Sequence, residues 1–111
     1  MRLDEDIKNQ IVERLKPLNP ERVILFGSYA YGQTPSRDSD IDLIVVTADG
    51  FVPQNFKENS DMYLKVSRRL RDIQVKIPID LIVFTKPMYQ KFVELKSMFS
   101  RKVLREGITL I

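Results

Sequence analysis

The sequence of 111 residues contains no cysteine and no histidine. Without cysteine the chain forms no disulfide and has no thiolate nucleophile, and without histidine it has no Ser-His-Asp triad. The two absences also exclude zinc sites built from Cys and His, so carboxylates remain as the ligands for a catalytic metal. Oxygen ligands favour a hard cation such as magnesium or manganese. Any enzyme chemistry here is therefore expected to depend on carboxylates, hydroxyls, Lys and a bound metal.

Long apolar runs are also missing. No stretch approaches the roughly 20 apolar residues that span a bilayer, and the first residues, MRLDEDIKNQ, are too acidic and polar for a secretion signal. A soluble cytoplasmic protein is the expectation. The net charge of +3, from 18 basic and 15 acidic residues, is too mild to indicate a nucleic-acid partner but suits a phosphate-bearing ligand. With 43% hydrophobic residues, residues 1–111 are expected to form one domain.

Hydrophobic periodicity predicts alternating helices and strands. Short continuous apolar runs indicate buried strands, and apolar residues spaced by three or four indicate amphipathic helices. Thr85 is a candidate N-cap for the last helix, whose expected buried stripe is Phe92, Leu95, Phe99 and Val103. The predicted fold is an α/β (α+β) sandwich with a small mixed sheet of three to four strands flanked by helices. The expected helices cover residues 4–16, 58–73 and 87–106, and the expected strands cover residues 23–26, 41–46, 79–84 and 108–111.

Two of these strands begin with carboxylates. Asp40 and Asp42 are two residues apart, so strand geometry sends both side chains to one face, and Asp80 stands at the start of the next strand. A lone Asp-x-Asp is more often a solvated strand end than a metal site. If the two strands pair side by side, however, all three carboxylates converge, and their mutual repulsion calls for a cation. Two magnesium ions roughly 3.5–4 Å apart would suit an in-line phosphoryl displacement.

A turn upstream has the features of a phosphate site. Gly27 and Ser28 follow an apolar strand, and a short helical turn is expected at residues 29–31, so that backbone N–H groups and a hydroxyl face outward. Gly27 would let the backbone approach a triphosphate closely, and Ser28 would donate a hydrogen bond to it. Gly32 is expected to close the turn.

The combined pattern resembles a known family. The run GSYAYGQTPSRDSDIDL, followed along the chain by Asp80 within IPIDLIV, is similar to the signature of the DNA polymerase beta-like nucleotidyltransferases. Within that superfamily the chain most resembles the minimal nucleotidyltransferases (MNT), which are single small domains. The resemblance extends from the leading helix to the ending REGITLI, and its three motif elements occur in the family's order.

The resemblance implies a role for each matching residue. Asp40 and Asp42 would hold both metals, and Asp80 would bind the catalytic metal and help to deprotonate the nucleophile. The residues implied for nucleotide binding are Gly27, Ser28 and Ser39, with ATP as the substrate. Many relatives carry Arg at the position of Tyr31, so one basic phosphate contact is missing here, and Arg37 is a candidate substitute.

The resemblance also implies a partner. Such domains commonly accompany a helical HEPN-type toxin as its antitoxin, and some relatives transfer AMP from ATP to a tyrosine hydroxyl of the toxin. Three hypotheses follow from this resemblance. The chain is an enzyme that modifies a partner protein, a non-catalytic nucleotide-binding module that masks its partner, or a small-molecule nucleotidyltransferase completed by dimerisation.

Two further groups of residues have no assigned role. The basic residues near the end of the second helix, and those along the last helix, are interpreted as solvated surface rather than a nucleic-acid patch, because interleaved aromatic residues are missing. An acidic partner remains an alternative. The first basic group is Arg68, Arg69, Arg71 and Lys76. The apolar group in the irregular segment, Phe51, Val52 and Phe56, is interpreted either as an exposed contact surface or as a cover of the core.

Overall fold

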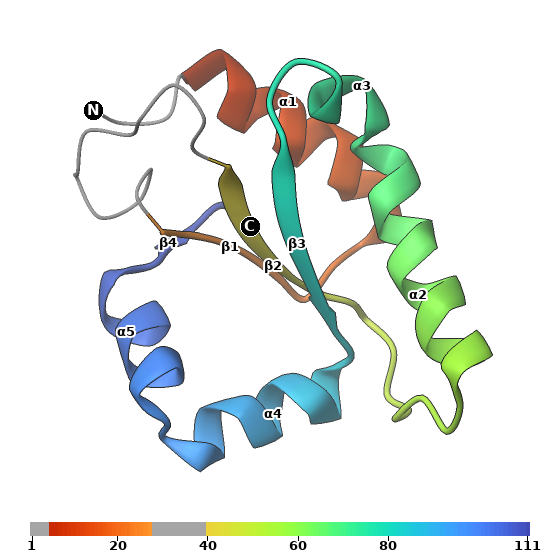
Figure 1. The fold of residues 1–111 in the computed structure, drawn as a ribbon, viewed down its shortest axis with the longest axis vertical. Helices are drawn as coiled ribbons and strands as arrows, with labels where there is room; N and C mark the ends of the chain where they lie inside the picture. The colour runs from red at the N-terminus through yellow and green to blue at the C-terminus, as the bar shows by residue number, and fades with distance from the viewer. Residues whose placement is uncertain (1–4, 28–39) are drawn as a thin grey trace.

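The computed structural model describes residues 5–27 and 40–111 of the chain. Helices and strands alternate along these residues, and the sheet lies between two groups of helices (Figure 1). The helices are α1 (Glu5–Leu15), the 3-10 helix η1 (Lys16–Leu18), α2 (Phe56–Arg69), α3 (Arg71–Gln74), α4 (Lys86–Leu95) and α5 (Met98–Glu106), and the strands are β1 (Arg22–Phe26), β2 (Ile41–Val46), β3 (Ile79–Phe84) and β4 (Ile108–Thr109).

The sheet is mixed, as the sequence predicts. Its strand order is β3-β2-β1-β4, with β1 antiparallel to β2 and β4, and β2 parallel to β3. The connection between the parallel strands β2 and β3 contains α2 and α3, which is the usual way to join parallel neighbours. The α/β sandwich with a small mixed sheet is therefore confirmed.

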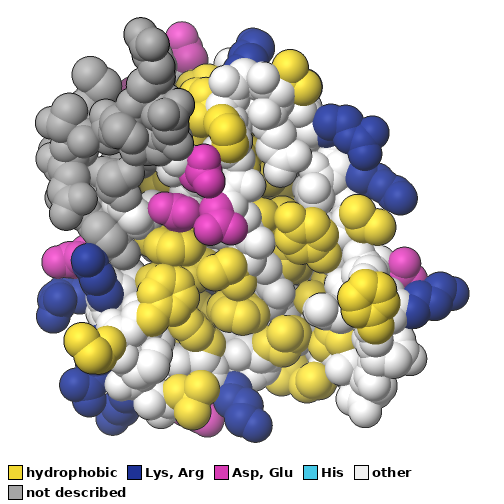
Figure 2. All heavy atoms as spheres, in the orientation of Figure 1, with side chains coloured by type: hydrophobic (Ala, Val, Ile, Leu, Met, Phe, Trp, Pro, Cys, Tyr) yellow, Lys and Arg dark blue, Asp and Glu magenta, His cyan; other side chains and the backbone are white. Residues whose placement is uncertain are grey.

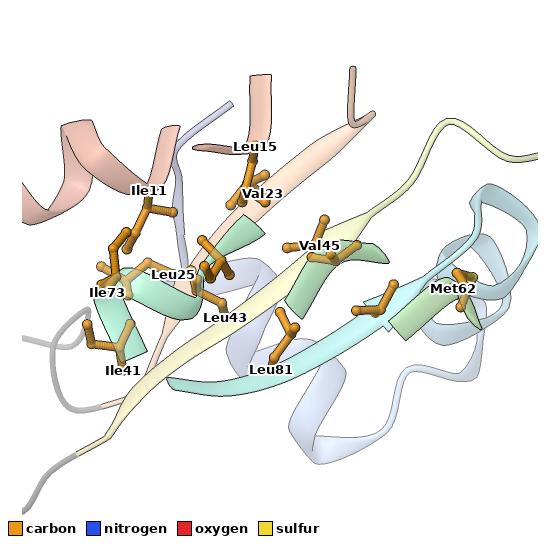
Figure 3. Packing of buried hydrophobic residues seen from close by; sticks show 13 residues of the cluster. Ile11, Leu15, Val23, Leu25, Ile41, Leu43, Val45, Met62, Ile73 and Leu81 are labelled. Carbon is orange, nitrogen blue, oxygen red and sulfur yellow. The ribbon is translucent and has the colours of Figure 1, made fainter. Parts of the chain in front are cut away.

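One face of the sheet carries the larger core. Alternate residues of the three longer strands point to this face, where α1, α2 and α3 cover them (Figure 3). Ile11 and Leu15 of α1 pack with Leu25 and Leu43 of the two central strands, and all four are fully buried. This apolar burial accounts for the continuous hydrophobic runs of β1 and β2, since strands covered on both faces need no polar alternation.

The opposite face carries a smaller, more aromatic core. Ile24, Phe26, Ile44 and Val46 of the sheet pack with Val103 of α5 on this face. Phe84, Tyr89 and Phe92 add ring contacts, with the Phe84 and Phe92 centroids 5.2 Å apart. Phe99 closes the group, with its ring centroid 5.4 Å from that of Phe26 in an edge-to-face arrangement. These contacts attach α4 and α5 to the sheet.

Both long helices of the second half are interrupted, which corrects the prediction of continuous helices over residues 58–73 and 87–106. The first interruption is at Leu70, between α2 and α3. The second is at Lys96, which adopts a left-handed conformation with φ 49°, and Ser97 then caps α5 by accepting a hydrogen bond from the Ser100 N–H at 3.1 Å. The break turns α5 relative to α4, so the two helices cover different parts of the sheet.

The same break explains why two residues of the expected buried stripe are exposed. Leu95, expected in the buried stripe, is 68% exposed, and Phe99 is 43% exposed, because one continuous helical face no longer runs through them. Thr85 takes the N-cap position of α4 but makes no capping hydrogen bond through its side chain. Its buried hydroxyl has no hydrogen-bond partner within the described residues.

The buried hydrophobic residues belong to the two cores. Among the helices at residues 5–27 and 40–111, none is long and apolar enough to cross a membrane. The helical turn expected at residues 29–31 lies outside the described residues.

The larger core should determine the stability of the protein. We expect Leu43→Ala to lower the free energy of unfolding by about 2–5 kcal/mol, because the side chain is fully buried in a central strand. Urea unfolding followed by circular dichroism measures this loss. Leu95→Ala is the matched control, since the same truncation at a largely exposed side chain should change stability by less than about 0.5 kcal/mol. Equal losses in both variants would contradict the assignment of the core.

Candidate active site

The three predicted carboxylates lie at one end of the sheet. Because β1 runs antiparallel to β2 and β2 runs parallel to β3, the end of β1 meets the starts of β2 and β3. In the register of the sheet, Asp42 lies opposite Phe26 on one side and opposite Asp80 on the other. Neighbouring strands are roughly 4.8 Å apart, so the backbones of the two aspartates are adjacent.

The alternation of the strands gives the side of the sheet on which these groups lie. Asp42 and Asp80 share the parity of Ile44 and Ile82, so they belong to the face with the aromatic core. Asp42 is half-buried, whereas Asp80 is exposed, as is Asp40, which stands directly before β2. Figure 2 shows acidic side chains gathered on this face of the molecule, above a group of apolar side chains.

The carboxylates repel one another. Burial raises the pKa of the Asp42 carboxyl above its ordinary value, and the negative charges of Asp80 and Asp40 raise it further. None of the three forms an ion pair with a basic side chain within residues 5–27 and 40–111. The site thus concentrates negative charge that the described part of the protein does not neutralise.

Gly27 packs directly against this group. Its φ of +79° lies in the left-handed region, which disfavours residues with a side chain. A Cβ atom built on Gly27 would clash with the Oδ2 atom of Asp42. The glycine therefore has two reasons to be here: the chain turns at the end of β1, and only a hydrogen atom fits beside the carboxylate.

The donor set fits a hard divalent cation in its chemistry. Carboxylate oxygens on adjacent strands, placed at a solvent-accessible end of the sheet, are the ligands that magnesium prefers. However, the described residues contain no group of three acidic side chains already placed around one ion position. Asp42 and Asp80 are the pair that the register of the sheet sets side by side.

The rest of the predicted nucleotide site lies outside the described residues. The predicted residues that lie outside are Ser28, Tyr31, Gly32, Arg37 and Ser39. Gly27 is the one member of the predicted phosphate turn that the structure describes. Its position against Asp42 puts the beginning of that turn beside the carboxylates.

Comparison with protein families identifies this arrangement. Residues 9–111 match the model described as polymerase beta, nucleotidyltransferase. The chain belongs to the polymerase beta nucleotidyltransferase family. The match covers the sheet, the three carboxylates and the Gly27 turn, so the nucleotidyltransferase fold expected from the sequence is confirmed. A comparison with curated proteins gives no match.

Solved structures of the same fold come from toxin–antitoxin complexes. A chain of a toxin–antitoxin crystal structure with AMP-PNP is 24% identical, with 94% of this nucleotidyltransferase chain and 72% of that chain covered and a TM-score of 0.61. A chain in the structure of a tri-AMPylated Shewanella oneidensis HEPN toxin with its MNT antitoxin is 20% identical, with 98% and 72% covered and a TM-score of 0.57. At these identities the similarity establishes the fold.

The structure adds one functional constraint that the sequence does not indicate. The sequence assigns Gly27 to phosphate approach, and nothing in its local pattern shows that the residue also contacts Asp42. The contact arises because β1 and β2 pair antiparallel, which places the residue after Phe26 beside the start of β2. The only local signal is a glycine at the end of an apolar strand.

Replacement of Gly27 tests this contact. We expect Gly27→Ala to lower the free energy of unfolding by at least about 1–2 kcal/mol, because the backbone is left-handed and the new methyl group meets the Asp42 carboxylate. The measurement is denaturant unfolding without added metal. Gly50→Ala is the matched control, since a Cβ there meets no atom within 4 Å. Equal stability of the two variants would show that Gly27 does not constrain the site.

The repulsion predicts that removing the charge of Asp42 stabilises the protein. Since the pKa of Asp42 is raised in the folded state, its ionised form destabilises the fold above that pKa, and the effect disappears at lower pH where the carboxyl is protonated. We therefore expect Asp42→Asn to raise the melting temperature of the metal-free protein at pH 7 by up to about 4 °C.

Thermal unfolding in the presence of a chelator measures the gain, which should shrink as the pH approaches about 4. Asp61→Asn, the same change at an exposed position of α2, should leave the melting temperature nearly unchanged. A lower melting temperature for Asp42→Asn would mean that the carboxylate is stabilised by its surroundings, contrary to the repulsion inferred here.

Proposed function

We propose that this protein is a magnesium-dependent nucleotidyltransferase that transfers a nucleoside monophosphate, AMP from ATP, to a hydroxyl of a partner protein. The observation that carries the proposal is the register of the sheet, which sets Asp42 beside Asp80 in a chain of the polymerase beta family. The raised pKa of Asp42 supports it, because carboxylates held together against their repulsion suit a site that binds a cation.

The proposed roles of these residues are those that the resemblance to the family implies. Asp40, Asp42 and Asp80 would hold two magnesium ions, which supply charge neutralisation at the phosphates when bound. Gly27, Ser28 and Ser39 would hold the triphosphate. The acceptor oxygen forms a bond to the α-phosphorus, the bond to the bridging oxygen breaks, and pyrophosphate leaves with that electron pair. Asp80, which is exposed at the sheet end, would accept the hydroxyl proton.

The proposed partner is a HEPN-type toxin, with this chain as its cytoplasmic MNT antitoxin. The support is that chains of the same fold occur in toxin–antitoxin structures, one containing AMP-PNP and one an AMPylated HEPN toxin. The domain itself would act as a single unit over residues 1–111.

A second candidate function is a nucleotide-binding module that neutralises its partner by masking it. The observation in its favour is that, within the described residues, the three carboxylates are not already grouped around one ion position. Tyr31 stands where many relatives have a basic residue, so one basic contact to the phosphates would be missing, which also favours this module.

Binding of a fluorescent ATP analogue, with and without magnesium, tests the nucleotide site. We expect magnesium to tighten binding by at least about tenfold, and Asp42→Asn to abolish that effect, because the cation links the carboxylate to the triphosphate. Asp61→Asn should bind as the native chain does. Absence of magnesium-dependent binding in the native chain would refute the proposed enzyme.

The two candidate functions differ in the fate of the partner. Intact-mass measurement of a partner co-purified with the native chain, after incubation with ATP and magnesium, should show the added mass of AMP. A partner neutralised equally well by Asp42→Asn, with no added mass from the native chain, would support the masking module instead.

A further inference from the structure

A second charged site lies on the other side of the sheet. Four arginines and one aspartate line a hollow of about 430 Å³ on the outer surface of α1, α2 and α3. These helices cover the face of the larger core, whereas Asp42 and Asp80 belong to the opposite face. Figure 2 shows basic side chains along the margin where α3 and the end of α2 lie in Figure 1. The lining residues are Arg14, Arg68, Arg69, Arg71 and Asp72.

Two of the arginines are held in place. Arg14 donates to the Oδ2 atom of Asp72 through Nε at 3.1 Å and through Nη2 at 2.7 Å. Arg69 donates through Nε to the backbone carbonyl of Arg14 at 2.9 Å. These bonds join α1 to the end of α2 and to α3, and they leave further guanidinium N–H groups available to a ligand. The hollow is therefore built from three helices rather than from one flexible basic stretch.

The charge of the hollow is unbalanced. Among the described residues that line the hollow, Asp72 is the only acidic one, and it is already paired with Arg14. The hydrogen bond from Arg14, together with its positive charge, lowers the pKa of the Asp72 carboxyl. Arg68 and Arg71 are exposed and form no ion pair with the described residues. Two exposed guanidinium groups beside a fixed ion pair give a surface that complements carboxylates or phosphates.

We propose that this arginine hollow binds an acidic segment of another protein, with Arg68 and Arg71 pairing with its Asp or Glu side chains. One observation favours carboxylates over a nucleic-acid backbone. No aromatic side chain lines the hollow among the described residues, so bases have no surface for stacking. The proposal goes beyond nucleotide transfer, since it uses none of the carboxylates of the active site.

Fluorescence anisotropy of a labelled oligoglutamate peptide with the full chain tests the proposal at about 50 mM salt, where screening is weak. We expect the double variant Arg68→Glu, Arg71→Glu to weaken binding by about tenfold or more, since two attractions become repulsions. The matched control is Lys91→Glu, Arg101→Glu on α4 and α5, which makes the same charge change at exposed positions elsewhere and should weaken binding by less than about twofold.

Three further measurements complete the test. Arg68→Gln, Arg71→Gln should also weaken binding while keeping the native melting temperature, which separates loss of binding from loss of folding. Asp42→Asn should bind the peptide like the native chain, so failure of the proposed nucleotide site would leave this result intact. Equal weakening by the control variant would show a general charge effect and overturn the proposal. Tighter, arginine-dependent binding of a single-stranded oligonucleotide of equal charge would overturn it in favour of nucleic acid.

Discussion

The parallel pairing of β2 with β3 is the constraint on which the rest of the molecule depends. It sets Asp42 opposite Asp80, and burial together with the charges of Asp80 and Asp40 raises the pKa of the Asp42 carboxyl. Such an arrangement works against folding unless something else holds the strands together. The apolar residues that follow each carboxylate do so, because Leu43 and Leu81 lie in register one position further along and are buried in the larger core. The site is thus held together by the hydrophobic packing directly behind it.

The two faces of the sheet carry different features. The face covered by α1, α2 and α3 carries most of the fully buried side chains and, on the outside of its helices, the arginine hollow. The face with α4 and α5 carries the smaller aromatic core and the carboxylates at its end. Because the sheet separates them, a cation with its nucleotide and an acidic protein segment could bind at the same time without competing for one surface. This separation is compatible with the proposed action on a second protein.

The parts of the fold that could be predicted are those with a local cause. β2 and β3 begin and end where the sequence indicates, since a carboxylate followed by an unbroken apolar run is typical of a buried strand with a solvated start. The helices were harder to predict. Lys96, in a left-handed conformation, ends α4 within the predicted last helix. The residue type does not predict this break, because Lys normally favours a helix. Leu95 therefore fits a helical stripe in the sequence but is largely exposed in the structure. The roles of Ser28 and Ser39 remain predictions.

The sequence by itself determined which chemistry is available. Without Cys and His, and with three carboxylates at strand starts after a Gly-Ser turn, it indicated a nucleotidyltransferase, and the family match confirms this. Each of those features depends on residues that are close together in the sequence, so each can be recognised from a single segment of the chain. Only the tertiary structure decided that Gly27 packs against Asp42 and that Arg14 joins the arginines of α2 and α3. These contacts bring together segments far apart in the chain, and their geometry depends on how the two cores pack rather than on any local pattern.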